Sequence, residues 1–274
     1  MILGIDVGGS TTKIVGLDAD GECVGMMSAE ANDQLTSAFG AFGKFTATCG
    51  LAMSDVRQIA VTGVGSSYLS DGIYDIPTNR VGEFEAIGLG GLKLAGLDEA
   101  IMVSVGTGTA LVRASNGQIR HLGGSGVGGG TLRNLAGRFA GAYHFSTITE
   151  MAASGDLSAV DLTLGDISRE KIGNLPPDTT VANFGNLKDT ATHADIVLGL
   201  INMIFESIGM MAVFAASNDS VKDIVLVGSL SVMDRAEPVF EGLANMHGLR
   251  FHIPKNAKYA TAMGAALACL NHLS

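Results

Sequence analysis

The chain has 274 residues, of which 47% are hydrophobic and 16% charged, and its formal net charge is -10. This composition excludes a disordered chain and predicts one large or two moderate domains with a well-buried core. The negative charge argues against a nucleic-acid partner, because a phosphate backbone needs clustered Lys and Arg. A single nucleotide is not excluded, since its phosphates depend on local hydrogen-bond donors.

The expected lack of a signal peptide and the pattern of cysteines predict a cytoplasmic location. The first residues carry no basic segment and enter a strand directly, so we expect no signal peptide. The apolar stretch 196–216 contains Asn202 and Glu206, which favours a buried helix and no membrane partner. Three cysteines are scattered without a CxxC pair, as is typical of a reducing compartment: Cys23, Cys49 and Cys269.

The most informative segment is LGIDVGGSTTKI at residues 3–14, which predicts strands over 2–7 and 11–17 joined by a tight turn. The turn offers backbone N–H groups, hydroxyls and Lys13, with the carboxylate of Asp6 beside them. Phosphate binds such donors, and a phosphate-bound Mg²⁺ binds a carboxylate. An ordinary Gly-Gly hairpin turn is the alternative for this segment alone.

The rest of the first third alternates strands and helices. We expect a strand over 22–29, a helix over 31–49, a strand over 58–62 and a helix over 83–95. Glu83 stands at the start of the last helix, where an acidic residue is also favoured simply by the helix dipole.

A second phosphate-like turn, SVGTGT at residues 104–109, lies between predicted strands over 100–105 and 109–113, with a third strand over 118–122. It matches the first turn in shape and position, which indicates a weak internal repeat. Two unrelated hairpins are the alternative. Two such turns in an α/β chain favour two lobes with a ligand between them, at the strand ends.

Glycine is densest in LGGSGVGGGT at residues 122–131, which precedes a predicted helix over 130–155. Such density costs backbone entropy and is typical of a backbone that touches a ligand. Amides that open a helix favour anions, although a mobile surface loop is the alternative.

The remaining pattern predicts helices and two strands, one of which ends in the small-residue turn Gly228-Ser229. A nucleoside can lie flat against such a turn because no side chain blocks it. The expected elements are helices over 158–170, 192–217, 231–246 and 258–272 and strands over 223–227 and 249–253.

Four segments, in this order, resemble the sugar kinase/heat-shock-70/actin ATPase superfamily. They are the two phosphate-like turns, the glycine-rich segment and the Gly228-Ser229 turn. With RVGEFEA at 80–86, MAASGD at 151–156 and VANFGN at 181–186, residues 2–267 resemble the type II (eukaryotic-like) pantothenate kinases. The resemblance implies an α/β, two-lobed ribonuclease-H-like (actin/hexokinase-like) ATPase fold with a ligand cleft between the lobes. The implied division is an N-terminal lobe over 1–98 and a C-terminal lobe over 99–274 that contains a helical dimerisation segment.

The same resemblance implies transfer of the ATP γ-phosphate to pantothenate, giving 4′-phosphopantothenate at the start of coenzyme A synthesis. Glu83 would be the catalytic base, Lys13 would lie near the transferred phosphate, and Asp6 would anchor Mg²⁺ through water. A cytoplasmic homodimer with coenzyme A as a feedback ligand is also implied. The implied ATP-binding residues are Gly8, Gly9, Ser10, Thr107, Gly108, Thr109, Gly128, Gly129, Gly130, Gly228 and Ser229.

The pattern departs from the family at the pantothenate site. The family has an arginine directly before the apolar–Gly–Gly segment, where this chain has His121. Arg120 is one place earlier and faces the other side of a strand unless a bulge turns it. His121 can donate a hydrogen bond but lacks the bidentate fork. The expected substrate-binding residues are Glu83, Arg120, His121, Gly123 and Ala182.

Three other functions remain open from the sequence. A kinase of another small hydroxylated metabolite, such as a sugar, is the nearest, although no Cys-rich zinc segment is present. An ATP-driven activator of radical dehydratases would need a cysteine-held iron–sulfur cluster, which three scattered cysteines fit poorly. A non-catalytic nucleotide-binding homologue is the third, and its ATP turnover would not depend on pantothenate.

Overall fold

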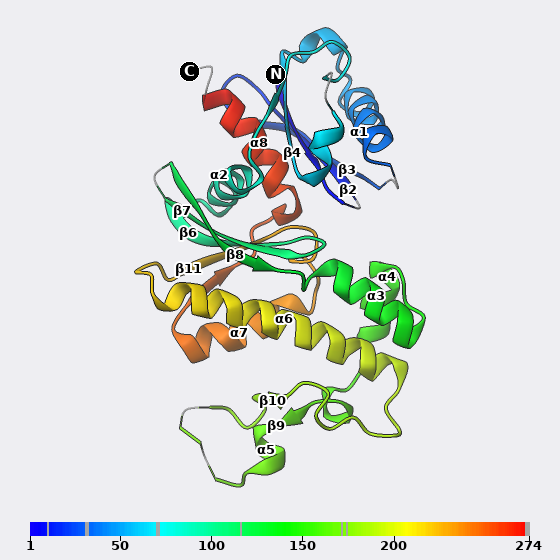
Figure 1. The fold of residues 1–274 in the computed structure, drawn as a ribbon, viewed down its shortest axis with the longest axis vertical. Helices are drawn as coiled ribbons and strands as arrows, with labels where there is room; N and C mark the ends of the chain where they lie inside the picture. Colours follow the sequence, from blue (N-terminus) through cyan, green and yellow to red (C-terminus); the bar gives the residue numbers. More distant parts are fainter. Residues whose placement is uncertain are drawn as a thin grey trace.

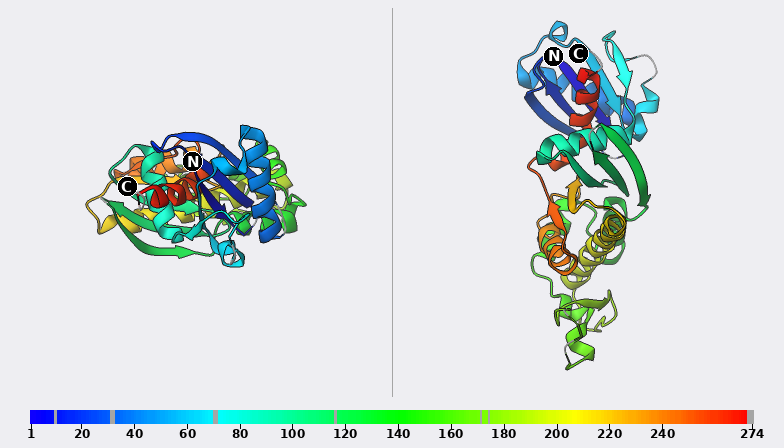
Figure 2. Two further views of the ribbon diagram at one scale, coloured as in Figure 1. Left: turned by 90° about the horizontal axis from the view of Figure 1, so that it is seen from above. Right: turned by 90° about the vertical axis from the view of Figure 1, so that its left-hand side faces the viewer.

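The computed structural model describes residues 1–9, 11–30, 33–69, 72–115, 117–170, 172–173 and 175–271, so Ser10 lies outside the described residues. Two five-stranded sheets follow one another along the long axis of the molecule, and a small third sheet occupies one end (Figure 1). Figure 2 shows the same elongated outline from the side.

The first sheet has the strand order β3-β2-β1-β4-β5. Strands β1 to β3 are antiparallel neighbours, whereas β4 runs parallel to β1 and β5 parallel to β4. Its strands are β1 (Ile2–Val7), β2 (Thr11–Leu17), β3 (Cys23–Glu30), β4 (Gln58–Thr62) and β5 (Thr78–Arg80).

The second sheet repeats this topology. Its order β8-β7-β6-β11-β12 has the same three antiparallel strands followed by two parallel ones. The turn after the first strand of each sheet therefore occupies the same position, and the predicted internal repeat is confirmed. The strands are β6 (Glu99–Val105), β7 (Thr109–Ser115), β8 (Gln118–Ser125), β11 (Asp223–Val227) and β12 (Arg250–His252).

Helices cover both faces of each sheet. The helix α1 (Gln34–Cys49) packs on the outer face of the first sheet, and α2 (Glu83–Ala95) and α8 (Ala260–Asn271) lie between the two sheets (Figure 1). The outer face of the second sheet is buried by a larger group of helices: α3 (Gly129–Ala140), α4 (Phe145–Ala152), α6 (His193–Ser217) and α7 (Ala236–His247).

The helices α2 and α8 touch backbone to backbone. A β-carbon added at Gly264 would overlap the carbonyl oxygen of Ala86, and one at Gly90 would overlap that of Ala260. On its other side α8 meets β1, where Gly4 faces the carbonyl of Ala262 in the same way. Helix α8, which the sequence division at residue 99 assigns to the second lobe, is thus wedged between the first sheet and α2.

Three predicted helices differ in the structure. The helix predicted over 130–155 is broken by Gly141, whose φ of 72° ends α3. The helix predicted over 231–246 begins only at Ala236. The helix predicted over 158–170 is wrong, because polar side chains there cap short turns. The segment instead contains β9 (Leu162–Thr163) and the short helix α5 (Leu164–Ile167). Strand β9 pairs with β10 (Thr180–Ala182).

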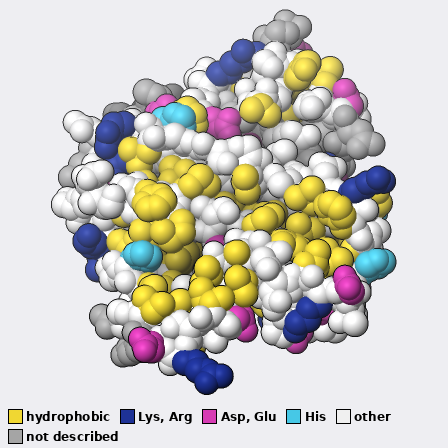
Figure 3. Space-filling view, turned by 60° about the horizontal axis from the view of Figure 1, so that its bottom comes forward, with side chains coloured by type: hydrophobic (Ala, Val, Ile, Leu, Met, Phe, Trp, Pro, Cys, Tyr) yellow, Lys and Arg dark blue, Asp and Glu magenta, His cyan; other side chains and the backbone are white. Residues whose placement is uncertain are grey.

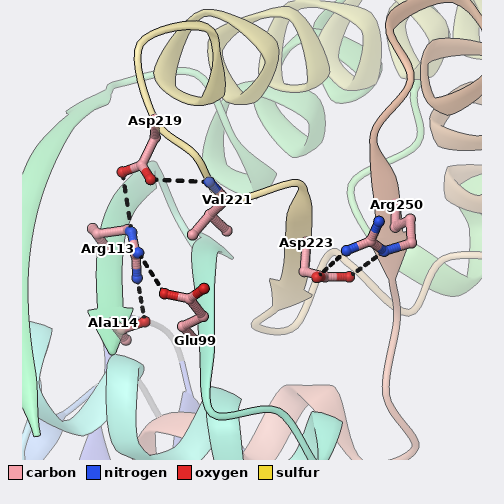
Figure 4. A network of polar contacts seen from close by, with 7 residues as sticks. All are labelled: Glu99, Arg113, Ala114, Asp219, Val221, Asp223 and Arg250. Carbon is pink, nitrogen blue, oxygen red and sulfur yellow. Dashed lines mark hydrogen bonds and ion pairs between the residues drawn. The ribbon is translucent and has the colours of Figure 1, made fainter. Parts of the chain in front are cut away.

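Ion pairs link the strands of the second sheet at the end opposite the turn between β6 and β7 (Figure 4). Arg113 of β7 donates to Asp219 at 3.0 Å and to Glu99 at 2.9 Å. At the neighbouring edge, the carboxylate of Asp223 accepts a hydrogen bond from Nε of Arg250 at 2.7 Å and interacts with Nε2 of His252 at 2.8 Å. These contacts join β6, β7, β11 and β12 with the segment after α6.

Replacing Asp223 with asparagine is expected to lower the free energy of unfolding near pH 7 by about 1 kcal/mol, as for a partly exposed ion pair. Hydrogen bonds from Arg250 are the largest influence that lowers the pKa of Asp223 to about 2, from an ordinary value of 3.8. The folded pKa is below the unfolded one, so the stabilisation is full above pH 4 and is lost as the pH falls toward 2. Urea unfolding at pH 7 and pH 3 measures this, and an equal effect at both would contradict it.

Within the described residues one helix, α6, is long and apolar enough to cross a membrane. In its most apolar stretch 67% of the residues are buried inside the protein, against the second sheet and the helices α3, α4 and α7.

Candidate active site

The two predicted phosphate turns face each other. A β-carbon added at Gly9, in the turn after β1, would lie 3.5 Å from the hydroxyl oxygen of Thr107, in the turn after β6. Both residues are exposed. Among the described residues, none accepts a hydrogen bond from the amides of Gly9, Thr107 and Gly108. These amides are therefore free to bind the oxygens of a phosphate placed between the turns.

The glycine-rich segment packs directly on the second turn. The amides of Gly129 and Gly130 donate to the carbonyls of Gly106 and Thr107 at 2.8 and 2.9 Å, and a β-carbon at Gly128 would lie 2.8 Å from Cα of Gly108. Its glycine density is explained by this loop-on-loop contact. Because two of its amides are already used, a nucleotide role for Gly128 to Gly130 stays a prediction that rests on close backbone approach.

Three further predicted residues, Thr109, Gly228 and Ser229, lie near the second turn or the glycine-rich segment. The buried hydroxyl of Thr109 donates to the carbonyl of Val127 at 2.8 Å, so it holds the glycine-rich segment. Gly228, with a φ of 95°, is so close to Val105 that a β-carbon would lie 2.5 Å from that carbonyl oxygen. Ser229 is exposed beside it. The structure thus brings the second turn, the glycine-rich segment and the 228–229 turn together.

A buried ion pair lies at the base of the first turn. Asp6 and Lys13 are antiparallel partners in β1 and β2, and Nζ of Lys13 lies 3.2 Å from Oδ2 of Asp6. Gly63, at the end of the parallel strand β4, has a φ of 85°, and a β-carbon there would lie 2.6 Å from Oδ1 of Asp6. Any larger residue at position 63 would therefore clash with the carboxylate of Asp6.

Glu83 begins α2 and lies beside this ion pair. Partial burial raises the pKa of Glu83, the negative charge of Asp6 raises it further, and Lys13 opposes both. A carboxylate with a raised pKa is a better proton acceptor than an ordinary one. Glu83, Lys13 and Asp6 therefore influence one another electrostatically at the edge of the first turn.

The predicted substrate residue His121 lies at the same helix start, because its ring stacks on that of Phe84. The ring centroids are 3.9 Å apart and the planes differ by 7°. Arg120 is instead paired with Arg113 across β7 and β8, and its charge helps to lower the pKa of Asp219. A bulge does occur in β8, but at Leu122, where it does not turn Arg120 toward Glu83.

Of the two remaining predicted substrate residues, Gly123 lies near this site and Ala182 lies far from it. Gly123 follows the bulge in β8, two residues from His121, with a φ of 146°. Ala182 ends β10, at the end of the molecule opposite the first lobe, with α6 between it and the second sheet (Figure 1). One chain therefore does not bring Ala182 together with Glu83.

The sequence patterns did not single out Gly63 or Phe84. Gly63 directly follows the predicted strand over 58–62, and a glycine in that place is the available signal. For Phe84 the signal is its place directly after the predicted base, since the stacking partner is distant in the sequence.

Comparisons of the sequence with known proteins find one family and several similar enzymes. The model of the family described as Fumble matches residues 99–238. A type II pantothenate kinase of Staphylococcus haemolyticus (strain JCSC1435) is 27% identical over 97% of this chain and 98% of its own. The type II pantothenate kinase of Staphylococcus aureus (strain USA300) is 29% identical over the same shares of both chains.

Solved structures confirm the predicted two-lobed α/β ATPase fold. The (R)-2-hydroxyglutaryl-CoA dehydratase component A of Acidaminococcus fermentans superposes with a TM-score of 0.71 at 16% identity, over 99% of this chain and 98% of its own. A ROK family glucokinase of Streptomyces griseus, in complex with glucose and AMPPNP, gives 0.63 at 12% identity, over 97% and 98%. At these identities the likeness concerns the fold alone.

Proposed function

Because this chain belongs to the Fumble family, we propose that it phosphorylates pantothenate with ATP to give 4′-phosphopantothenate, the first step of coenzyme A biosynthesis. The observation that carries the proposal is Glu83, a carboxylate of raised pKa beside the Asp6–Lys13 pair, within a chain similar to type II pantothenate kinases over nearly its whole length.

In the proposed reaction the primary hydroxyl of pantothenate attacks the γ-phosphorus of ATP. The new O–P bond forms as the bond between that phosphorus and the β–γ bridging oxygen breaks, so ADP leaves, and Glu83 takes the hydroxyl proton. Phosphoryl transfer depends mainly on positioning and charge neutralisation. The free amides of Gly9, Thr107 and Gly108 support the first role, and Lys13 the second.

The residues present fit a magnesium ion that accompanies the nucleotide. Within the described residues no three His, Cys, Asp or Glu side chains form a cluster that could hold a metal alone. Mg²⁺ usually keeps several waters and uses one or two carboxylates together with substrate phosphates. Asp6 would hold it through water, and the ion would neutralise charge on the phosphates.

A homodimer is part of the proposal. The remoteness of Ala182 from Glu83 in one chain means that a substrate role for Ala182 requires a second copy. Exposed apolar side chains support a partner surface: Phe139 on α3, Phe214 on α6 and Val181 on β10. Figure 3, with this end of the molecule turned forward, shows hydrophobic side chains gathered on one face. A cytoplasmic location, feedback by coenzyme A and the lobe division at residues 98 and 99 are further parts of the proposal.

An ADP-release assay tests the function. We expect pantothenate to stimulate ADP release from ATP and Mg²⁺ at least tenfold above the level without an acceptor, and glucose and other sugars to leave it unchanged. Stimulation by a sugar alone would identify a kinase of another metabolite. ATP binding without any acceptor-dependent turnover would identify a non-catalytic homologue.

A further inference from the structure

The ring pair of Phe84 and His121 joins the two lobes beside the proposed base. Phe84 is in the first turn of α2, directly after Glu83, and His121 is in β8 of the second sheet. The rings are nearly parallel, 3.9 Å apart between centroids, and Phe84 stays 39% exposed. An exposed phenyl ring that covers one face of an imidazole fixes the plane of that imidazole.

The stacking leaves the hydrogen-bonding edge of His121 free. Both ring nitrogens lie in the plane of the imidazole, so a partner on its face blocks neither. His121 is exposed, and in the described part of the chain neither of its ring nitrogens makes a hydrogen bond. The bulge supports this orientation, because the extra residue Leu122 packs into the core on the other face of the sheet.

Orientation matters more for a histidine than for an arginine. A guanidinium presents five donors in a planar fork, so several orientations of the side chain can satisfy an acceptor. A neutral imidazole has a single N–H donor, and a small rotation of the ring removes its hydrogen bond. A histidine at this position therefore needs a neighbour that holds the ring.

We propose that Phe84 is a positioning residue: its ring holds the imidazole of His121 so that a ring N–H donates to an oxygen of the acceptor substrate beside Glu83. The identity of that acceptor as pantothenate rests on the proposed function. Phe84 itself acts through His121. The competing explanation is that the ring pair only fastens α2 to β8, in which case its loss changes stability but not substrate binding.

Steady-state kinetics of four variants separate these explanations. Phe84→Leu is expected to raise KM for pantothenate about five- to tenfold, as for one lost hydrogen bond, with kcat and KM for ATP within twofold of wild type. His121→Phe keeps two rings but has no N–H, and should raise that KM about as much. When Phe84→Leu is combined with His121→Phe, it should raise KM for pantothenate no further, since no imidazole remains to be held. Phe84→Tyr should restore the KM of the wild type.

A matched control is Phe39→Leu, which removes the contact between Phe39 of α1 and the ring of Tyr74 and should leave every kinetic constant unchanged. The positioning role is overturned if Phe84→Leu leaves KM for pantothenate unchanged, or raises it equally in the His121→Phe background. The wild type distinguishes the two proposals: without pantothenate-dependent ADP release the proposed function fails, whereas wild-type turnover with unaffected variants overturns the positioning role alone.

Discussion

Replacing Glu83 with glutamine is expected to lower kcat for pantothenate-dependent ADP release by about 100-fold or more, the usual loss for a general base. Glutamine keeps the size and hydrogen-bonding capacity of the side chain but cannot accept the proton of the attacking hydroxyl. KM for ATP should change little, because in the proposed site the phosphates bind to the two turns and not to Glu83. Steady-state kinetics at saturating ATP measure both constants.

The matched control is Glu85→Gln, which removes the same charge two residues further along α2 and should keep kcat near that of the wild type. The pH dependence gives a second test. Since burial and Asp6 raise the pKa of Glu83, kcat/KM of the wild type should fall as the pH drops through that raised value. Glu83→Gln should lack this limb, and a variant that keeps both kcat and the limb would contradict the assignment.

Replacing Gly264 with alanine is expected to lower the free energy of unfolding by about 3 kcal/mol, at the upper end of the usual cost of overpacking. The added methyl group would overlap the carbonyl oxygen of Ala86, which belongs to helix backbone and cannot rotate away. The helices α2 and α8 must therefore move apart, and both sheets pack on them. Urea unfolding followed by far-ultraviolet circular dichroism measures the loss.

Gly43→Ala is the matched control, because this glycine also lies inside a helix but has nothing within 4 Å of a new β-carbon. It should stabilise the protein by about 0.5–1 kcal/mol through helix propensity. If Gly264→Ala were as harmless as Gly43→Ala, the close packing of α2 on α8 would be wrong.

The parts of the fold that the sequence predicted are those with local signals. Asp6 and Lys13 flank a glycine pair between two apolar strands, and residues 104–109 show the same pattern, so the turns and the repeat could be recognised. The region after α4 could not, because its short turns depend on individual side chains such as Asp156 and Asp166 that accept from nearby amides and hydroxyls. Those carboxylates lie in a pattern that also suits a helix.

The site was predicted at the level of segments but not of contacts. The glycine-rich segment was expected to touch a ligand, whereas two of its amides donate to carbonyls of the second turn, a contact that no spacing of glycines reveals. The partnership of Phe84 with His121 depends on strand register and on the bulge at Leu122, both set by long-range pairing. Such contacts join residues far apart in sequence and have no periodicity of their own.

The position of α8 also determines when the first lobe can be completed during synthesis. The inner face of its sheet, with Ile2, Val15 and Ala60, is buried by a helix that follows every other described element along the chain. A nascent chain that has emerged only through β5 can pair its strands and dock α1, but it leaves this apolar face uncovered. Such long-range closure slows folding and exposes intermediates to aggregation. Translation must therefore reach α8 before the first lobe is protected on both faces.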